Sequence, residues 1–129
     1  MRVVRREDII NPVNSSSGEE IYEMIGRPPE NGGTTNHSLA HVVISSGKSS
    51  EAHYHKVSEE TYYILRGVGL MIVDKQQVRL QPGQACLINP FEIHRIFNDG
   101  EDDLEFLAVS APAWTSGDSF FTTEETLRR

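Results

Sequence analysis

Short runs of β-branched and aromatic residues, separated by turn-forming residues at close intervals, constrain the fold of this chain more than any other feature. Gly, Pro, Asn and Ser cluster between the runs, and helical periodicity is scarce. The pattern predicts an all-β sandwich or barrel. A Thr three residues ahead of a Glu near the C-terminus adds a short helix over residues 124–129. The expected strands are residues 2–10, 20–25, 39–44, 52–56, 61–66, 69–73, 77–80, 85–88, 94–98 and 104–110.

The length and composition of the chain predict one domain. It has 129 residues, 37% of them hydrophobic, which is enough for a single core. We expect one domain over residues 1–129, with a barrel core at about 39–110 between an N-terminal arm and a C-terminal tail. Residues 27–38 contain two Pro and two Gly and are too polar for an element. They are expected to form a long loop, or a lid.

The charge and cysteine content exclude several classes of partner and scaffold. A formal charge of -7 repels phosphate backbones and anionic lipids, so we expect no nucleic acid or membrane partner. The N-terminal residues lack the apolar region of a signal peptide. The single Cys86 forms no internal disulfide and is expected to be a small buried hydrophobe. We therefore expect a cytoplasmic protein.

Two of the expected strands are apolar on both faces, at residues 62–65 and 70–73. The interior of one barrel covers only one face of a strand. In so short a chain, the outer cover is expected to be a second copy, which gives a homodimer. Residues 2–10 are a candidate arm for the edge of the partner's sheet, or alternatively a frayed terminus.

Histidines are the most informative polar residues. In His53-Tyr54-His55, the period of two in a strand directs both imidazoles to the same face. Glu60 follows His55 by an odd number of positions, so a bend is needed to bring it to that face. We expect this corner at residues 56–59, with the next strand running antiparallel beside the first. The carboxylate of Glu60 then lies next to the two imidazoles.

A third imidazole, His94, comes from a later strand. Three imidazoles and one carboxylate suit a divalent transition metal (Fe, Mn, Ni, Zn or Cu) and leave coordination positions open for a small-molecule substrate. On the residues alone, His53 and His55 are equally interpretable as a solvated surface pair.

These residues resemble the two motifs of the cupin superfamily. The first motif matches throughout, with Gly47, His53, His55, Glu60 and Gly67 at the spacing of the family. In the second, Asn89 and Phe91 stand where Pro and Gly are usual, whereas Gly83, Pro90, His94 and Asn98 match. The resemblance implies a double-stranded β-helix, or jelly-roll barrel, often paired as a dimer. It also implies one metal ion held by His53, His55, Glu60 and His94 at the open end.

Tyr62 and His41 are candidate catalytic residues. By parity, Tyr62 shares the face of Glu60, and a phenol beside a cation loses its proton more easily and acts as a base. Some metal-dependent lyases of the family are similar, with a Tyr two residues past the Glu. The alternative is packing in the barrel. His41 is a candidate proton shuttle, or else a hydrogen-bonded or exposed wall residue.

Three more residues are candidates for the substrate pocket: Phe91 at its rim, Phe106 facing inward, and Asn98 on the face of His94. Arg66 and Arg95 are not expected to approach the metal, so a strongly anionic substrate finds no counter-charge except the metal itself.

The expected function is that of a metal-dependent enzyme. Its substrate is a small oxygen-bearing metabolite, and dioxygenase, isomerase and lyase chemistry all fit such a centre. The alternative is a non-catalytic module that binds a sugar-like or carboxylate ligand. A structural barrel without metal is a third possibility.

Overall fold

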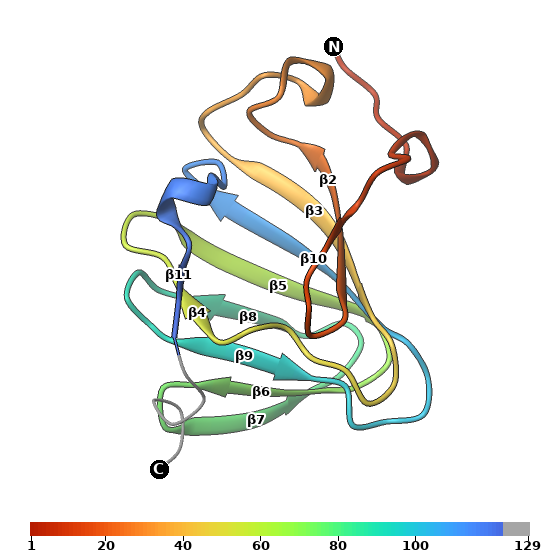
Figure 1. Cartoon of the computed structure of the whole chain (residues 1–129), viewed down its shortest axis with the longest axis vertical. Helices are drawn as coiled ribbons and strands as arrows, with labels where there is room; N and C mark the ends of the chain where they lie inside the picture. The colour runs from red at the N-terminus through yellow and green to blue at the C-terminus, as the bar shows by residue number, and fades with distance from the viewer. Residues whose placement is uncertain (123–129) are drawn as a thin grey trace.

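Two antiparallel β-sheets face each other in the computed structural model, which describes residues 1–122 (Figure 1). The six-stranded sheet has the order β1 (Val13–Asn14), β2 (Glu19–Ile25), β3 (Ser38–Ile44), β10 (Leu104–Ala111), β5 (Glu59–Arg66) and β8 (Ala85–Ile88). The five-stranded sheet has the order β11 (Phe120–Phe121), β4 (His53–Tyr54), β9 (His94–Phe97), β6 (Gly69–Val73) and β7 (Gln76–Leu80). This architecture confirms the expected jelly-roll barrel.

Within residues 1–122, helical structure is limited to single turns of 3₁₀ helix. These are η1 (Arg6–Asp8), η2 (Pro29–Asn31) and η3 (Ser116–Asp118). No helix in this part of the chain is long and apolar enough to cross a membrane. The helix expected over residues 124–129 lies outside the described residues.

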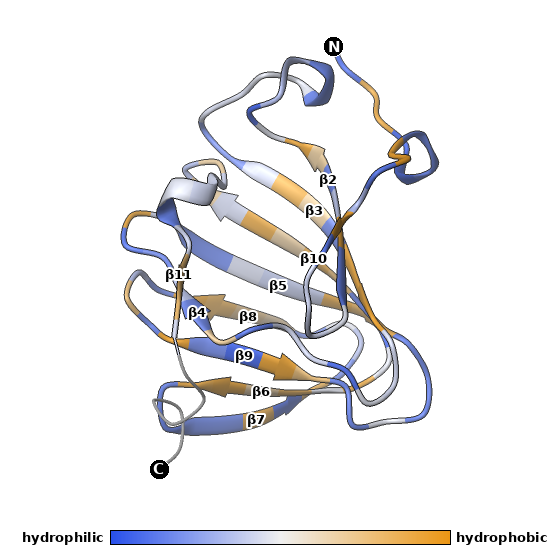
Figure 2. Cartoon of the chain, viewed as in Figure 1, coloured by the Kyte–Doolittle hydropathy of each residue, from blue (hydrophilic) through white to orange (hydrophobic). Residues whose placement is uncertain are grey.

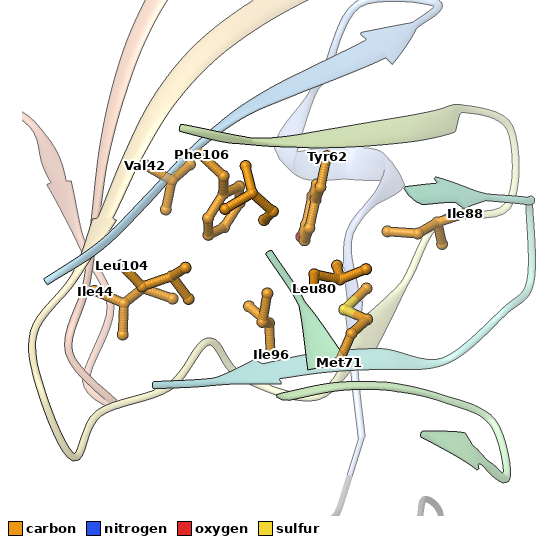
Figure 3. Packing of buried hydrophobic residues seen from close by; sticks show 10 residues of the cluster. Val42, Ile44, Tyr62, Met71, Leu80, Ile88, Ile96, Leu104 and Phe106 are labelled. Carbon is orange, nitrogen blue, oxygen red and sulfur yellow. The ribbon is translucent and has the colours of Figure 1, made fainter. Parts of the chain in front are cut away.

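The core lies between the two sheets because alternate residues of each strand point inward. On β5, Glu60, Tyr62 and Ile64 are buried, and Tyr63 between them is exposed. In Figure 3, Tyr62 and Phe106 from the six-stranded sheet face Met71, Leu80 and Ile96 from the other sheet. The buried cluster consists of Val42, Ile44, Tyr62, Ile64, Met71, Leu80, Ile88, Ile96, Leu104 and Phe106.

The inner face of the six-stranded sheet changes character along its strands. At one end, Ser110 on β10 pairs with both Ser38 on β3 and Glu60 on β5, and all three are buried. At the other end, Leu104 pairs with Ile44, and both are fully buried. The barrel is therefore packed with apolar side chains at one end and lined by polar groups at the other.

One edge strand carries mainly polar residues, which limits its pairing with other chains. Strand β7 is the edge of the five-stranded sheet and is largely hydrophilic (Figure 2). Four of its five residues are exposed.

Gly67 in the turn before β6 has a φ of 80°, and a Cβ atom there would lie 2.5 Å from the Asp103 carbonyl oxygen, so glycine is required.

The strand expected at residues 2–10 is wrong. This segment contains η1, because the Asp8 carboxylate accepts a hydrogen bond from the Arg5 backbone N–H and stabilises a local turn. Arg2 donates to the carbonyl oxygens of Pro29 and Glu30, and the guanidinium of Arg6 lies over the Tyr22 ring. The segment thus contacts its own chain. Strands β1 and β11 are short elements that the sequence did not predict.

The expected pairing of the two strands that carry the first motif is also wrong. Strand β4 lies in the five-stranded sheet and β5 in the six-stranded sheet. The chain crosses the barrel between them at residues 55–58, so Glu60 meets the imidazoles across the interior rather than along one sheet.

Candidate metal centre

Three imidazoles and one carboxylate converge at the polar end of the barrel. His53 and His94 lie directly opposite each other on β4 and β9, and His55 follows β4. One donor atom from each of His53, His55, Glu60 and His94 lies within 4.8 Å of the other three. Donor atoms around one ion at about 2.1 Å are separated by up to about 4 Å, so this cluster is close to the required size.

Backbone carbonyl groups fix the orientation of all three rings. The Nδ1 atoms of His53, His55 and His94 lie 2.7, 2.7 and 3.0 Å from the carbonyl oxygens of Glu51, Asp118 and Glu92. A carbonyl oxygen only accepts, so Nδ1 carries the proton in each neutral ring. The lone pair on Nε2 is therefore directed toward the centre of the cluster, as metal ligation requires.

Glu60 completes the donor set. Its Oε1 lies 3.4 Å from His55 Nε2 and 3.3 Å from His94 Nε2, yet these three buried atoms form no well-aligned hydrogen bond. Its Oε2 accepts a hydrogen bond from Ser110 Oγ at 3.1 Å. Burial alone would raise the pKa of Glu60, but the adjacent His55 and His94 outweigh burial and hold it far below its usual value. An ionised carboxylate and three lone pairs with no partner fit a divalent cation.

The cluster opens into a cavity between β2, β3, β5 and β10. The volume of this cavity is about 100 Å³. Apolar walls and a few polar groups line it, as in small-ligand sites. The lining residues are Val13, Glu19, Ile21, Glu23, Ser38, Ala40, Val42, His53, His55, Glu60, Tyr62, Ala108, Ser110 and Trp114.

Asp118 in η3 holds the corner between β4 and β5. Its carboxylate accepts hydrogen bonds from the backbone N–H groups of residues 56, 57 and 58 at 2.9 to 3.3 Å. Its own carbonyl oxygen is the acceptor for the His55 ring. One residue near the C-terminus thus positions both the crossing segment and a candidate ligand.

Replacement of Asp118 by Ala is expected to weaken this corner. Three N–H groups lose their charged acceptor, so we expect the free energy of unfolding to fall by about 1–3 kcal/mol. Because His55 is then less well held, metal affinity should fall about 10- to 100-fold. Chemical denaturation and competition with a chelator measure the two effects. The exposed acid Asp102 gives a control variant, Asp102→Ala, which should change neither; unchanged metal affinity in Asp118→Ala would contradict the positioning role.

Tyr62 lines the cavity beside the cluster. Its ring lies 6.1 Å from that of His94 and 4.5 Å from that of Phe106, measured between centroids. Burial, followed by the charges of Glu60 and Glu19, raises its pKa well above the usual value. The phenol therefore keeps its proton in the structure as described, and the ring forms part of the cavity wall.

His41 lies on the opposite side of its sheet from the cavity. The neighbouring residues Ala40 and Val42 line the cavity, so parity turns His41 outward. There its Nε2 lies 3.0 Å from the carboxylate of Glu105, and its ring is near Tyr22. The expectation of a proton shuttle is not supported by this position; of the alternatives, the structure matches a hydrogen-bonded wall residue.

The three residues expected in the substrate pocket do not line the cavity. Phe106 is fully buried in the core beneath Tyr62. The amide of Asn98 is used within its own turn, where it donates to the carbonyl oxygens of Ile44 and Asp102. Phe91 has a φ of 72° and is 63% exposed, with its ring near that of Tyr54. The turn thus gives Phe91 a left-handed backbone conformation, and its exposed side chain is not part of the cavity lining.

Sequence reasoning missed two acidic residues of the cavity, Glu19 and Glu23. Both are on β2, and together with Ile21 they occupy its inward positions. The Glu19 side chain has no hydrogen-bonding or ion-pairing partner among residues 1–122, and the residue is 9% exposed. Burial, followed by the negative charges of Glu60 and Glu51, raises the pKa of Glu19 to about 7.

Comparisons with known proteins agree with this geometry. The chain is 32% identical over 120 residues to an uncharacterized protein of Methanocaldococcus jannaschii, covering 92% of this chain and 94% of that protein. It is 39% identical over 71 residues to an oxalate-binding protein of Thermotoga maritima, covering 55% of this chain and 59% of that protein. A crystal structure of a predicted oxalate decarboxylase from Thermotoga maritima superposes with a TM-score of 0.73 at 29% identity, covering 85% of this chain and 98% of that one.

The family model for the cupin domain matches residues 40–110. This segment begins in β3 and ends in β10, and it contains all four residues of the donor cluster. The match covers more than half of the chain and agrees with both the barrel and the resemblance of the two motifs. The chain therefore belongs to the cupin domain family.

Proposed function

We propose that the protein binds one divalent transition-metal ion through His53, His55, Glu60 and His94. One observation carries this proposal. The Nε2 atoms of His55 and His94 and the Oε1 atom of Glu60 are buried, close together and without a hydrogen-bond partner among residues 1–122. Such an arrangement is costly unless a cation compensates it. On this proposal, residues 1–129 form a single domain with its barrel core at about 39–110.

We further propose that the protein is a metal-dependent enzyme acting on a small oxygen-bearing metabolite. The bound ion would supply Lewis-acid or redox activation of a coordinated oxygen. The chain's own residues hold this site in place. Backbone carbonyls orient the rings, Ser110 holds the second oxygen of Glu60, and the apolar walls of Ile21, Ala40 and Val42 limit the access of water. Dioxygenation, isomerisation and lyase chemistry are the reaction classes to be tested.

A second candidate is a module that binds a small ligand without converting it. A relative named an oxalate-binding protein, 39% identical over 71 residues, favours this alternative. Both candidates use the same metal centre and cavity. They differ in whether a bound molecule leaves the cavity chemically changed.

A substrate panel distinguishes the two candidates. The metal-loaded protein is incubated with carbonyl, diketone and sugar compounds, and with oxalate, while products and oxygen uptake are followed. We expect conversion of at least one compound, and its loss in His55→Ala. Circular dichroism checks that this variant is folded, and His94→Gln serves in its place if it is not. Binding without conversion of any compound would contradict the enzyme proposal and support the binding module.

We also propose that the protein is a homodimer. Tyr63, Leu87 and Val109 lie on the outer face of neighbouring strands of the six-stranded sheet and are 43%, 55% and 36% exposed. A second copy of the chain would cover this apolar face. Light scattering should then give twice the chain mass, whereas the chain mass itself would contradict a dimer.

A cytoplasmic location is part of the proposal, because the single Cys86 forms no internal disulfide.

A further inference from the structure

The cavity has an unusual distribution of charge. Its donor cluster lies on β5, β9, β4 and the residue after β4, whereas Glu19 and Glu23 lie on β2. Within the six-stranded sheet, β3 and β10 separate β2 from β5. Three strand spacings correspond to about 14 Å along the sheet, so the two acids line a different part of the cavity wall from Glu60.

Neither acid is used by the fold in an evident way. The carboxylate of Glu19 has no partner among residues 1–122, although the residue is nine-tenths buried. Oε2 of Glu23 is buried and makes no hydrogen bond within the described residues, although the Glu23 side chain as a whole is only partly buried. Buried polar groups are normally paired, so the unpaired carboxyl group of Glu19, with the Glu23 side chain on the same cavity wall, indicates a missing partner.

The cavity supplies no positive charge of its own opposite the metal centre. Within the described part of the chain, its lining contains no Lys or Arg. The positive charge of Arg27 acts to lower the pKa of Glu23. The hydrogen bonds of its guanidinium, however, go to the carbonyl oxygen of Ala113 at 3.1 and 3.2 Å. The partner of the two acids must therefore come from outside the cavity wall.

We propose that the ligand of this cavity has an oxygen donor at one end, for the metal, and hydrogen-bond donors at the other end, for Glu19 and Glu23. The donors are hydroxyl or ammonium groups, which share the ability to donate to a carboxylate. A second carboxylate at that end meets two acids in a buried site and is disfavoured. The inference rests on the proposed metal site and narrows its substrate class, because it disfavours a ligand that carries a second carboxylate at the end facing Glu19 and Glu23.

Two further properties of the acids agree with this class. Burial and nearby negative charges raise the pKa of Glu19 to about 7, so near neutral pH it can either donate to or accept from a hydroxyl group. Burial also raises the pKa of Glu23, and Arg27 offsets this only in part. Both carboxyl groups can therefore form hydrogen bonds with a hydroxyl or ammonium group of the ligand, in place of the hydrogen bonds that they form with water.

Three four-carbon compounds test the proposal, because they share a 2-hydroxycarboxylate group that chelates a metal and differ only at the far end. These are malate, 2,4-dihydroxybutanoate and 4-amino-2-hydroxybutanoate, which end in a carboxylate, a hydroxyl and an ammonium group. Binding is measured by the change in visible absorption of the Co²⁺-loaded protein. We expect the hydroxyl and ammonium compounds to bind at least about tenfold more tightly than malate. If one of these two compounds binds more tightly than the other, the site prefers the donor group of that compound, either the hydroxyl or the ammonium.

Matched variants connect this preference to the acids. Glu19→Gln and Glu23→Gln should each reduce the preference over malate at least about threefold, because each removes an ionisable carboxyl group from the cavity wall. Glu20→Gln makes the same change in net charge at an exposed position of the same strand and should leave the preference unchanged.

The outcomes separate this inference from the proposed function. Absence of a Co²⁺ spectrum would contradict the metal site itself. With the metal bound, the inference alone fails if malate binds as tightly as the other compounds, if none of the three binds, or if Glu20→Gln alters the preference as much as the two cavity variants do.

Discussion

His94→Gln should lower the affinity for the metal by at least about 100-fold, since it removes one of four donors from the centre of the site. His94 is fully buried on β9 and directs its Nε2 toward Glu60. Glutamine has a similar volume, so the barrel is expected to remain folded. The metal content after dialysis, and competition with a chelator of known affinity, measure the loss.

His41→Gln is the matched control, because it makes the same chemical change at a histidine on the outer face of the sheet. His41 pairs with Glu105 and does not line the cavity. We expect full metal content in this variant. Equal losses in the two variants would mean that the measured ion is bound elsewhere, or only weakly and nonspecifically.

Glu19→Gln should stabilise the metal-free protein at pH 8. The fold raises the pKa of Glu19 from 4.5 to about 7, so the ionised carboxylate costs the folded state about 3 kcal/mol, at about 1.4 kcal/mol per pKa unit. The amide avoids this cost. Denaturation with urea in the presence of a chelator measures the difference between the variant and the natural chain.

The pH dependence of this difference follows from the raised pKa. Below pH 4.5 the carboxyl group is protonated in both the folded and unfolded states, so the natural chain is not penalised. Between pH 4.5 and about 7 the carboxyl group ionises in the unfolded chain but stays protonated in the folded chain, so the natural chain loses stability as the pH rises. The benefit of Glu19→Gln should therefore be absent below pH 4.5 and complete above pH 7.

Comparison between variants is needed because His53 acts in the opposite direction. Burial, followed by the charge of His94, lowers the pKa of His53 to about 4. The folded state thus loses stability as the pH falls from 6.5 toward 4, in every variant alike. Glu20→Gln, at an exposed position, should change stability by less than about 0.5 kcal/mol. A Glu19→Gln variant no more stable than this control at pH 8 would show that Glu19 is not a buried charge.

The sequence predicted the donor cluster because its signals are local and periodic. The period of two places His53 and His55 on one face, and the motif spacing adds Glu60 and His94. The route by which Glu60 arrives was not predictable in this way. The segment at residues 55–58 that crosses between the sheets is held by Asp118, which lies 60 or more residues further along the chain and carries no local signal.

The acids on β2 were missed for a different reason. Both faces of this strand carry charged and apolar residues, Glu19, Ile21 and Glu23 on one and Glu20, Tyr22 and Met24 on the other. Parity therefore fixes which residues share a face, but not which face is buried. The same ambiguity affected His41, whose strand is apolar on both faces. The packing of the two sheets against each other decides which face of each strand is buried, and the local sequence pattern does not contain this information.

The most direct test of the central claim is a crystal structure of the metal-loaded protein, with the ion identified by anomalous scattering. The account predicts one anomalous peak at about 2.0–2.2 Å from the Nε2 atoms of the three histidines and from an oxygen of Glu60. A well-ordered barrel grown in saturating metal with no peak among these four side chains, or with a peak that contacts only one or two of them, would contradict it.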